Sequence, residues 1–154
     1  MTATASVAGP VPAYDSVAEG TELAEKRSRI RRADLIRYCG ASGDFNVIHW
    51  NERAAREVGL PDVIAHGMLT MAKAARIVTD WLGDPAAIEE YAVRFSRPVV
   101  VPDDEDGAEL LVTARVAKKL PDGRVRVDIV ARTGSDESGW EKVLSMARAV
   151  VVLP

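Results

Sequence analysis

The feature that most constrains the fold is an apolar stretch that runs from His66 to Leu82. On a helix over this stretch, apolar side chains cover most of the surface: Met68, Leu69, Met71, Ala72, Ala74, Ala75, Ile77, Val78 and Leu82. A helix that is apolar on most faces is normally buried on most faces. The chain has 154 residues, which suits a single domain. The pattern therefore predicts a sheet wrapped around one central helix over about 66–82, with Met68 and Met71 in the core.

The second half of the chain contains the runs expected to form this sheet. Four segments are rich in β-forming residues: Tyr91–Val101, Ala108–Leu120, Arg124–Thr133 and Glu141–Leu153. The third of them alternates polar and apolar residues, as a sheet with one solvated face requires. Pro121-Asp122-Gly123, directly before it, is typical of a turn. Segregated helices followed by consecutive strands predict the α+β class.

The first half of the chain is expected to be irregular at its start and helical later. Residues 1–15 are predicted to be disordered, and the domain is predicted to span 16–154. The strongly basic stretch 24–32 predicts an edge strand that leads into a helix over 33–39. A second short helix is expected over 52–58, and the segment between the two helices has the composition of a loop.

Composition and charge exclude several classes of function. The net charge is -3 and aromatic residues make up 5%, so the chain shows neither a general basic surface for nucleic acid nor aromatic platforms for bases. No apolar run approaches the ~20 residues of a membrane helix, and the N-terminus lacks the features of a signal peptide. Cys39 is the single cysteine, which excludes an intrachain disulfide. We expect a cytoplasmic protein without nucleic-acid or membrane partners.

The first of the two histidines lies in a loop-like segment together with a carboxylate. Asp44 and His49 are five residues apart in Gly43-Asp44-Phe45-Asn46-Val47-Ile48-His49. If a turn brings them together, they can share a water, and an imidazole moves protons in both directions near neutral pH. Asn46 is placed to hold either of them. The segment also fits a plain connection between helices, with Asp44 capping a turn and His49 half exposed.

The second histidine stands at the start of the apolar helix, in His66-Gly67-Met68-Leu69. A helix N-terminus presents free N–H groups and a partial positive charge. Glycine at this point lets a ligand carbonyl approach closely, so the N–H of Gly67 is a candidate oxyanion donor. His66 is a candidate for substrate binding at the same place, or else a cap or a satisfied buried polar group.

The remaining polar features point less clearly to chemistry. The basic stretch suits a CoA phosphate, a phosphopantetheine or an acidic carrier protein, or simply the solvated face of a strand. Cys39 has no adjacent base in sequence and is expected in the core. No phosphate-binding glycine loop is present, and two histidines without a cysteine cluster give little reason for a metal. We expect no cofactor and no metal.

Taken together, the two histidine segments resemble the MaoC-like, (R)-specific enoyl-CoA hydratase family, which has the hot-dog fold. The family motif of an aromatic residue followed by Gly-Asp-x-Asn-Pro-hydrophobic-His is matched from Tyr38 to His49, except that Val47 replaces the proline. The family's His-Gly-Met-Leu is present from His66. The likeness covers roughly 16–153 and looks especially close to the catalytic subunit of mycobacterial-type β-hydroxyacyl-ACP dehydratases.

The resemblance implies roles for five residues and a type of reaction. Asp44 and His49 would form the catalytic pair around one water, with Asn46 in support. The N–H of Gly67 would bind the thioester carbonyl, with His66 beside it. Water would add to a trans-2-enoyl thioester of CoA or acyl carrier protein, giving the (R)-3-hydroxyacyl thioester, or leave it in the reverse direction, as in fatty-acid or polyketide metabolism.

The resemblance also implies a dimer, with either a second copy or a related hot-dog subunit. Two alternatives remain at this point. A hot-dog thioesterase would use the same fold for hydrolysis, although such enzymes usually place their carboxylate differently. A non-catalytic acyl-binding subunit of a heterodimer would need neither Asp44 nor His49.

Overall fold

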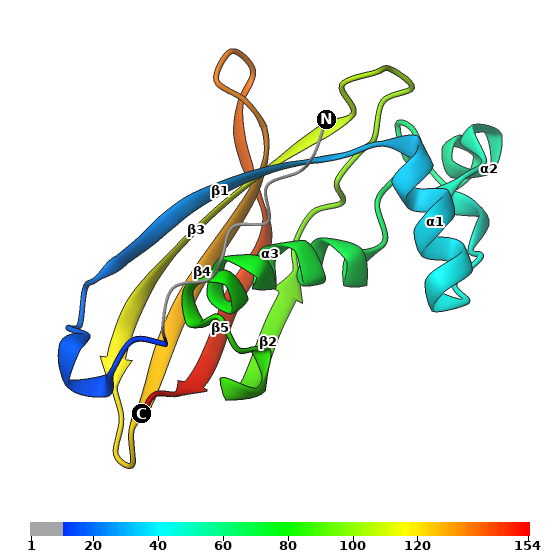
Figure 1. Cartoon of the computed structure of the whole chain (residues 1–154). Helices are drawn as coiled ribbons and strands as arrows, with labels where there is room; N and C mark the ends of the chain where they lie inside the picture. The colour runs from blue at the N-terminus through cyan, green and yellow to red at the C-terminus, as the bar shows by residue number, and fades with distance from the viewer. Residues whose placement is uncertain (1–10) are drawn as a thin grey trace, which may run out of the picture.

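The structure, a computed structural model, describes residues 11–154 as one antiparallel sheet with a helix across it (Figure 1). The strands are β1 Glu22–Ile30, β2 Ile88–Phe95, β3 Ala108–Lys119, β4 Arg124–Ser135 and β5 Gly139–Val152. The helices are α1 Arg32–Ser42, α2 Glu52–Glu57 and α3 Gly67–Leu82, and short 3-10 turns are η1 Tyr14–Ser16, η2 Val47–His49 and η3 Pro85–Ala87. The strand order is β1-β3-β4-β5-β2. The predicted α+β class is confirmed, and the basic stretch is an edge strand.

The sheet curves around α3, which packs against β1, β2, β3 and β4 (Figure 1). One buried cluster joins the two layers, and it includes Ala74, Ile77 and Val78 of α3 with Val125, Val127 and Ile129 of β4. Full burial of a side chain such as Ile77 contributes roughly 1.5–3 kcal/mol. All four strand pairings contain a register shift, and such bulges increase twist and bending. The predicted central helix is confirmed.

One side of α3 faces solvent in the single chain. Met68, for example, keeps 57% of its surface exposed, and Ala72 is exposed one turn further on. The prediction that this helix is buried on most faces is therefore wrong for one chain, as is the core position predicted for Met68. The physical reason is that a single five-stranded sheet covers only one side of the helix. Within residues 11–154, no helix is both long and apolar enough to cross a membrane.

The strand predicted over Tyr91–Val101 ends early, and this shortening matters for the site. β2 stops at Phe95, the N–H of Ser96 still donates to the Val143 carbonyl at 3.0 Å, and the residues that follow leave β5. They pair instead with the segment before α3: the N–H of Ala65 donates to the Val99 carbonyl at 2.8 Å, and that of Val101 to the Val63 carbonyl at 3.0 Å. Pro98 lacks an N–H and cannot continue a ladder. The change of partner brings the start of α3 beside the end of β2.

The hydroxyl of Tyr91 attaches β2 to α3. It donates to the carbonyl of Met71 at 2.8 Å. Burial raises the pKa of Tyr91 to about 12, so the phenol remains protonated and able to donate at neutral pH. The bond holds the edge strand against the helix close to the point where β2 ends.

The N-terminal segment is described only in part. Residues 1–10 of the predicted disordered stretch lie outside the described residues. Tyr14 lies within them, and its N–H donates to the Pro154 carbonyl at 2.8 Å while its hydroxyl donates to the Leu120 carbonyl at 2.9 Å. The predicted domain boundary at residue 16 stays a prediction.

The guanidinium of Arg32 joins three segments that the sheet does not connect. It donates to the Val101 carbonyl at 2.7 Å, to Glu52 at 3.0 Å and to Asp62 at 2.9 Å. Its side chain is largely buried, with 22% of its surface exposed. Planar, divergent N–H groups make arginine suited to such a role. Arg32 thus holds α1, α2 and the segment leading to α3 together.

We expect Arg32→Met to lower the free energy of unfolding by about 2 kcal/mol, because two carboxylates and a carbonyl lose their shared donor. Among residues 11–154, only the more exposed Arg56 would remain near the two carboxylates. Arg53→Met is the matched control, since Arg53 is exposed and, within the described part of the chain, pairs only with Glu57 on the same helix; such a pair contributes roughly 0.5 kcal/mol or less. Urea unfolding measures both, and equal losses would contradict the role of Arg32.

Candidate active site

The loop that follows α1 is shaped by one left-handed residue and two consecutive side-chain turns. Gly43 ends the helix with φ of 75°, a conformation that glycine adopts without steric cost. Asp44 Oδ1 then accepts from the N–H of Asn46 at 3.1 Å, and Asn46 Oδ1 accepts from the N–H of Ile48 at 3.3 Å. Bonds of this kind, from a side chain to the backbone two residues on, stabilise tight turns. They carry the chain directly into the turn that ends at His49.

Asp44 and His49 face each other at a distance that suits a shared water. Asp44 Oδ2 and His49 Nε2 are 4.0 Å apart, which is too far for a direct hydrogen bond but allows one water to contact both. His49 Nδ1 lies 2.8 Å from the Ile64 carbonyl. Because a carbonyl only accepts, Nδ1 carries the proton and Nε2 presents a lone pair. His49 is buried, whereas half of the Asp44 side chain is exposed.

His66 lies behind this pair. Only 1% of its surface is exposed, and its ring stacks on that of His49 with centroids 3.8 Å apart and an interplanar angle of 24°. Its Nε2 lies 3.2 Å from the backbone carbonyl of Asp44 and 3.6 Å from the thiol sulfur of Cys39. Although His66 occupies the N-cap position of α3, its side chain makes no capping bond.

Burial lowers the pKa of His66 below its ordinary value near 6.5. The bond to the Asp44 carbonyl opposes this effect, and the neighbouring His49 adds to it. The lowered pKa favours a neutral ring at physiological pH, with its proton on Nε2 because the Asp44 carbonyl accepts there.

A cavity of about 300 Å³ opens in front of His49 and the start of α3. It is lined by His49, Ile64, Ala65, Gly67, Thr70, Phe95, Ser96, Arg97, Pro98, Val99, Val143 and Leu144. Gly67 is the first residue of α3 and is exposed, so its N–H is among those that a helix leaves without an internal partner. The cavity therefore brings an imidazole and a helix N-terminus to one apolar space, at the small end of the roughly 300–1,000 Å³ range of ligand pockets.

Gly67 lies close to the ring of Phe95. A Cβ atom at this residue would lie 3.1 Å from the nearest carbon of the Phe95 ring. Such a contact is tighter than ordinary van der Waals distance, so a side chain here would displace the ring. The absence of a side chain leaves the first turn of α3 open to a ligand.

Asp44, His49 and His66 also offer three potential metal ligands within 4.8 Å of one another. Two observations make them a poor cation site. The two imidazoles are stacked, so the lone pairs in their ring planes point alongside each other rather than at a common centre. One nitrogen of each ring is also engaged with a backbone carbonyl. The arrangement fits proton transfer better than tetrahedral coordination.

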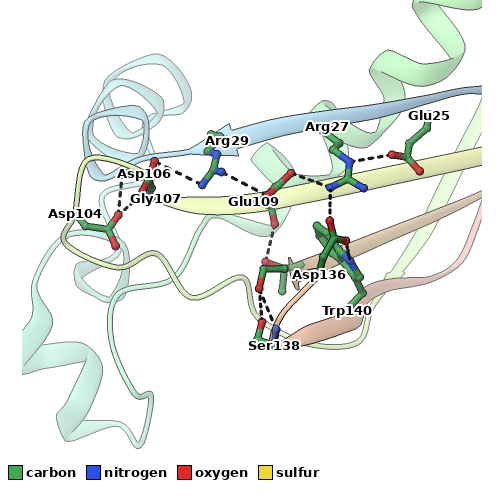
Figure 2. A network of polar contacts seen from close by, with 12 residues as sticks. Glu25, Arg27, Arg29, Asp104, Asp106, Gly107, Glu109, Asp136, Ser138 and Trp140 are labelled. Carbon is green, nitrogen blue, oxygen red and sulfur yellow. Dashed lines mark hydrogen bonds and ion pairs between the residues drawn. The ribbon is translucent and has the colours of Figure 1, made fainter.

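The basic stretch on β1 is neutralised mainly within the domain, as Figure 2 shows for two of its arginines. Arg27 pairs with Glu25 at 2.9 Å, Glu109 at 3.5 Å and Asp136 at 3.6 Å. Arg29 pairs with Glu109 at 3.6 Å. Lys26 pairs with Asp80, and Arg32 is held as described above. This geometry favours a solvated strand face over a docking site for a phosphate or an acidic carrier protein.

Cys39 is buried, as predicted, but its surroundings differ from those expected. The sequence shows no base beside it, whereas the fold places His66 next to its sulfur. Both groups are almost completely covered, so the thiol is not accessible to a substrate. Cys39 is part of the packing around His66.

The family model of the MaoC-like domain matches residues 15–132 of the chain. The chain belongs to the MaoC-like domain family. The solved structure of a MaoC-like dehydratase superimposes on 94% of the chain with a TM-score of 0.87 and 37% identity. The predicted hot-dog fold is thereby confirmed.

Two curated relatives of this MaoC-like domain are named for dehydration and hydration. The "3-hydroxyacyl-thioester dehydratase X" of Mycobacterium tuberculosis is 37% identical over 60% of the chain. The "(R)-specific enoyl-CoA hydratase" of Rhodospirillum rubrum is 27% identical over 92% of the chain and 91% of its own length. The chain spans 35% of the mycobacterial dehydratase and 43% of the solved MaoC-like dehydratase.

Several residues around the site were not identified from the sequence. Phe95, Thr70 and Leu144 line the cavity, and Arg32 supports the segments around it. They come from four elements, and no local pattern marks them. Leu144 lies in the strand predicted over Glu141–Leu153, but the sequence does not show that it lines a cavity. The position of Phe95 beside Gly67 depends on the departure of the chain from β5 after Ser96.

We expect Val47→Pro to raise the free energy of unfolding by about 0.4–1 kcal/mol. Val47 is the first residue of η2, a position that suits proline, and Asn46 before it is extended with ψ of 126°. Proline at residue 47 reduces the number of conformations of the unfolded chain, so less entropy is lost on folding. Thermal unfolding measures the change, with turnover expected to be retained. A loss of stability would show that the backbone at residue 47 is incompatible with proline.

The lowered pKa of His66 predicts a loss of stability in mild acid. Between the folded pKa and the unfolded value near 6.5, the unfolded state binds more protons. Stability is therefore greatest above pH 6.5 and falls as the pH drops through the folded pKa. Urea unfolding from pH 8 to pH 5 should show a shallower fall for His66→Gln than for the unchanged protein. Identical pH dependence in the two would contradict the prediction.

Proposed function

We propose that this MaoC-like domain is a hydro-lyase that reversibly adds water to trans-2-enoyl thioesters and removes it from (R)-3-hydroxyacyl thioesters. The observation that carries the proposal is the 4.0 Å separation of Asp44 Oδ2 and His49 Nε2 beside a cavity that also contains Gly67. The names of the two relatives support the same reaction type. That reaction requires a water held between the two side chains and the thioester carbonyl of the substrate held at the helix N-terminus.

In the hydration direction, Asp44 and His49 hold the water and accept one of its protons. The oxygen bonds to Cβ of the enoyl group as the Cα–Cβ double bond opens toward the thioester carbonyl. The pair then returns a proton to Cα, so one water is added in total. His49 Nε2 is suited to the transfer because its other nitrogen is fixed as a donor to Ile64.

The thioester oxygen gains negative charge while Cβ is attacked. The N–H of Gly67 and the partial positive charge of α3 stabilise that oxygen. Most residues that line the cavity are apolar, and a substrate bound there would displace water and so strengthen these interactions. Asn46 supports the reaction indirectly, because its N–H donates to Asp44 Oδ1 and its Oδ1 accepts from the N–H of Ile48, and these bonds shape the turn between the members of the pair.

The substrate in this proposal is an acyl thioester of CoA or of an acyl carrier protein. The partner is a second copy or a related hot-dog subunit. The uncovered side of α3 supports the association: Met68 is exposed there, and Phe95 keeps 51% of its surface exposed near the mouth of the cavity. A partner that covers these side chains would remove apolar surface from water.

We expect Asp44→Asn and His49→Ala each to lower turnover of crotonyl-CoA at least ~100-fold. Loss of the enoyl absorbance reports hydration, and a thiol reagent reports hydrolysis in the same samples. Asp103→Asn serves as the matched control, since this carboxylate is exposed in the loop before β3. Circular dichroism checks that the variants fold.

Two outcomes would contradict the proposal. Release of thiol without hydration would indicate a thioesterase. Near-unchanged turnover in both site variants would show that Asp44 and His49 are not the reacting pair, as expected for an acyl-binding subunit in which the activity belongs to a partner.

A further inference from the structure

The proposed mechanism gives no task to His66, a titratable group that contacts both members of the pair. We propose that His66 is a positioning residue. Its side chain holds Asp44, His49 and the N–H of Gly67 in fixed positions relative to one another. This inference rests on the proposed function. It assigns His66 a place behind the reacting groups, because His66 is not among the residues that line the cavity.

His66 contacts both members of the pair with different parts of its ring. Its Nε2 donates to the Asp44 carbonyl at 3.2 Å, and that carbonyl belongs to the residue that begins the two side-chain turns. The face of the ring lies 3.8 Å from that of His49. One side chain therefore limits the movement of the carboxylate along the loop and the tilt of the imidazole.

The backbone of His66 connects these contacts to α3. Its carbonyl accepts from the N–H of Thr70 at 3.1 Å and from the hydroxyl of Thr70 at 3.3 Å, which closes the first turn of the helix. Gly67 is the next residue in that turn. His66 is thus bonded directly to the residue whose N–H would bind the thioester oxygen. A displacement of about 1 Å in a reacting group can lower turnover roughly a hundredfold, so a shift of His66 that moves Gly67 would lower turnover.

The role requires a neutral ring, and the surroundings favour one. The charged or titratable groups that face His66 are Asp44 and His49, with Cys39 at 3.6 Å and the ring of Tyr38 at 4.8 Å. Among residues 11–154, Nδ1 of His66 has no hydrogen-bond partner. A proton on Nδ1 would thus have no acceptor there, and a cation stacked on His49 would oppose proton uptake by that ring.

Two substitutions of His66 separate the contribution of its hydrogen-bond donor from that of its aromatic ring. His66→Gln keeps an N–H that can reach the Asp44 carbonyl but removes the aromatic ring. His66→Phe keeps the ring and its packing but removes the donor. If His66 only filled space, Phe would preserve function better than Gln. The positioning role predicts the opposite order, because the unsatisfied Asp44 carbonyl would allow the loop to move.

We expect His66→Phe to lower kcat for crotonyl-CoA about tenfold or more, with KM within about threefold of the unchanged protein. His66→Gln should retain kcat within about threefold. Cys39→Ala is the matched control, since it removes another buried contact of His66 Nε2 without touching Asp44 or His49, and its kcat should be nearly unchanged. Equal or better turnover in His66→Phe than in His66→Gln would overturn the positioning role.

Nitrogen-15 NMR of the histidine rings tests the geometry without any activity. We expect His66 to be neutral at pH 7, with its proton on Nε2. A proton on Nδ1, or a cationic ring at that pH, would overturn the inference even in an active enzyme. Failure of the proposed function has a different signature, namely unchanged turnover in Asp44→Asn and His49→Ala.

Discussion

The arrangement of the candidate site depends on the short antiparallel contact between residues 63–65 and 99–101. This chain segment leaves the main sheet after Ser96, and beyond Pro98 its backbone groups bond instead to the segment before α3. That contact places the Ile64 carbonyl where His49 Nδ1 donates to it. It also puts the first turn of α3 beside Phe95. One change of strand partner therefore determines both the tautomer of His49 and the position of the first turn of α3.

The fold class and the central helix could be predicted because they rest on local periodicity. The apolar period of residues 66–82 and the alternation in β4 each correspond to one type of element. The boundaries of the strands depend on more than the local sequence. The strand predicted over 91–101 includes the apolar residues that resume at Val99, and only the tertiary structure shows that these pair with another segment. The burial of α3 was overestimated for the same reason, since periodicity does not show how many layers cover a helix.

The candidate site could be predicted in its members but not in its geometry. Asp44, Asn46 and His49 are close in sequence, and the turns that join them are local, so the motif itself contains much of the structure. His66 is different. Sequence placed it at the helix N-terminus, on the substrate side, whereas the structure stacks it behind His49 and covers it. Such a position depends on α1, which supplies Tyr38 and Cys39, and no spacing rule within one segment reveals it.

The contact between Gly67 and Phe95 has a consequence for how sequences of this kind can vary. A Cβ at residue 67 would lie 3.1 Å from the Phe95 ring, so a side chain there requires either a small shift of the ring or a smaller residue at 95. Mutations at the two positions should be non-additive, as is usual for residues in direct contact. A library that varies them singly would underestimate the range of acceptable pairs, and the two sites are best diversified jointly.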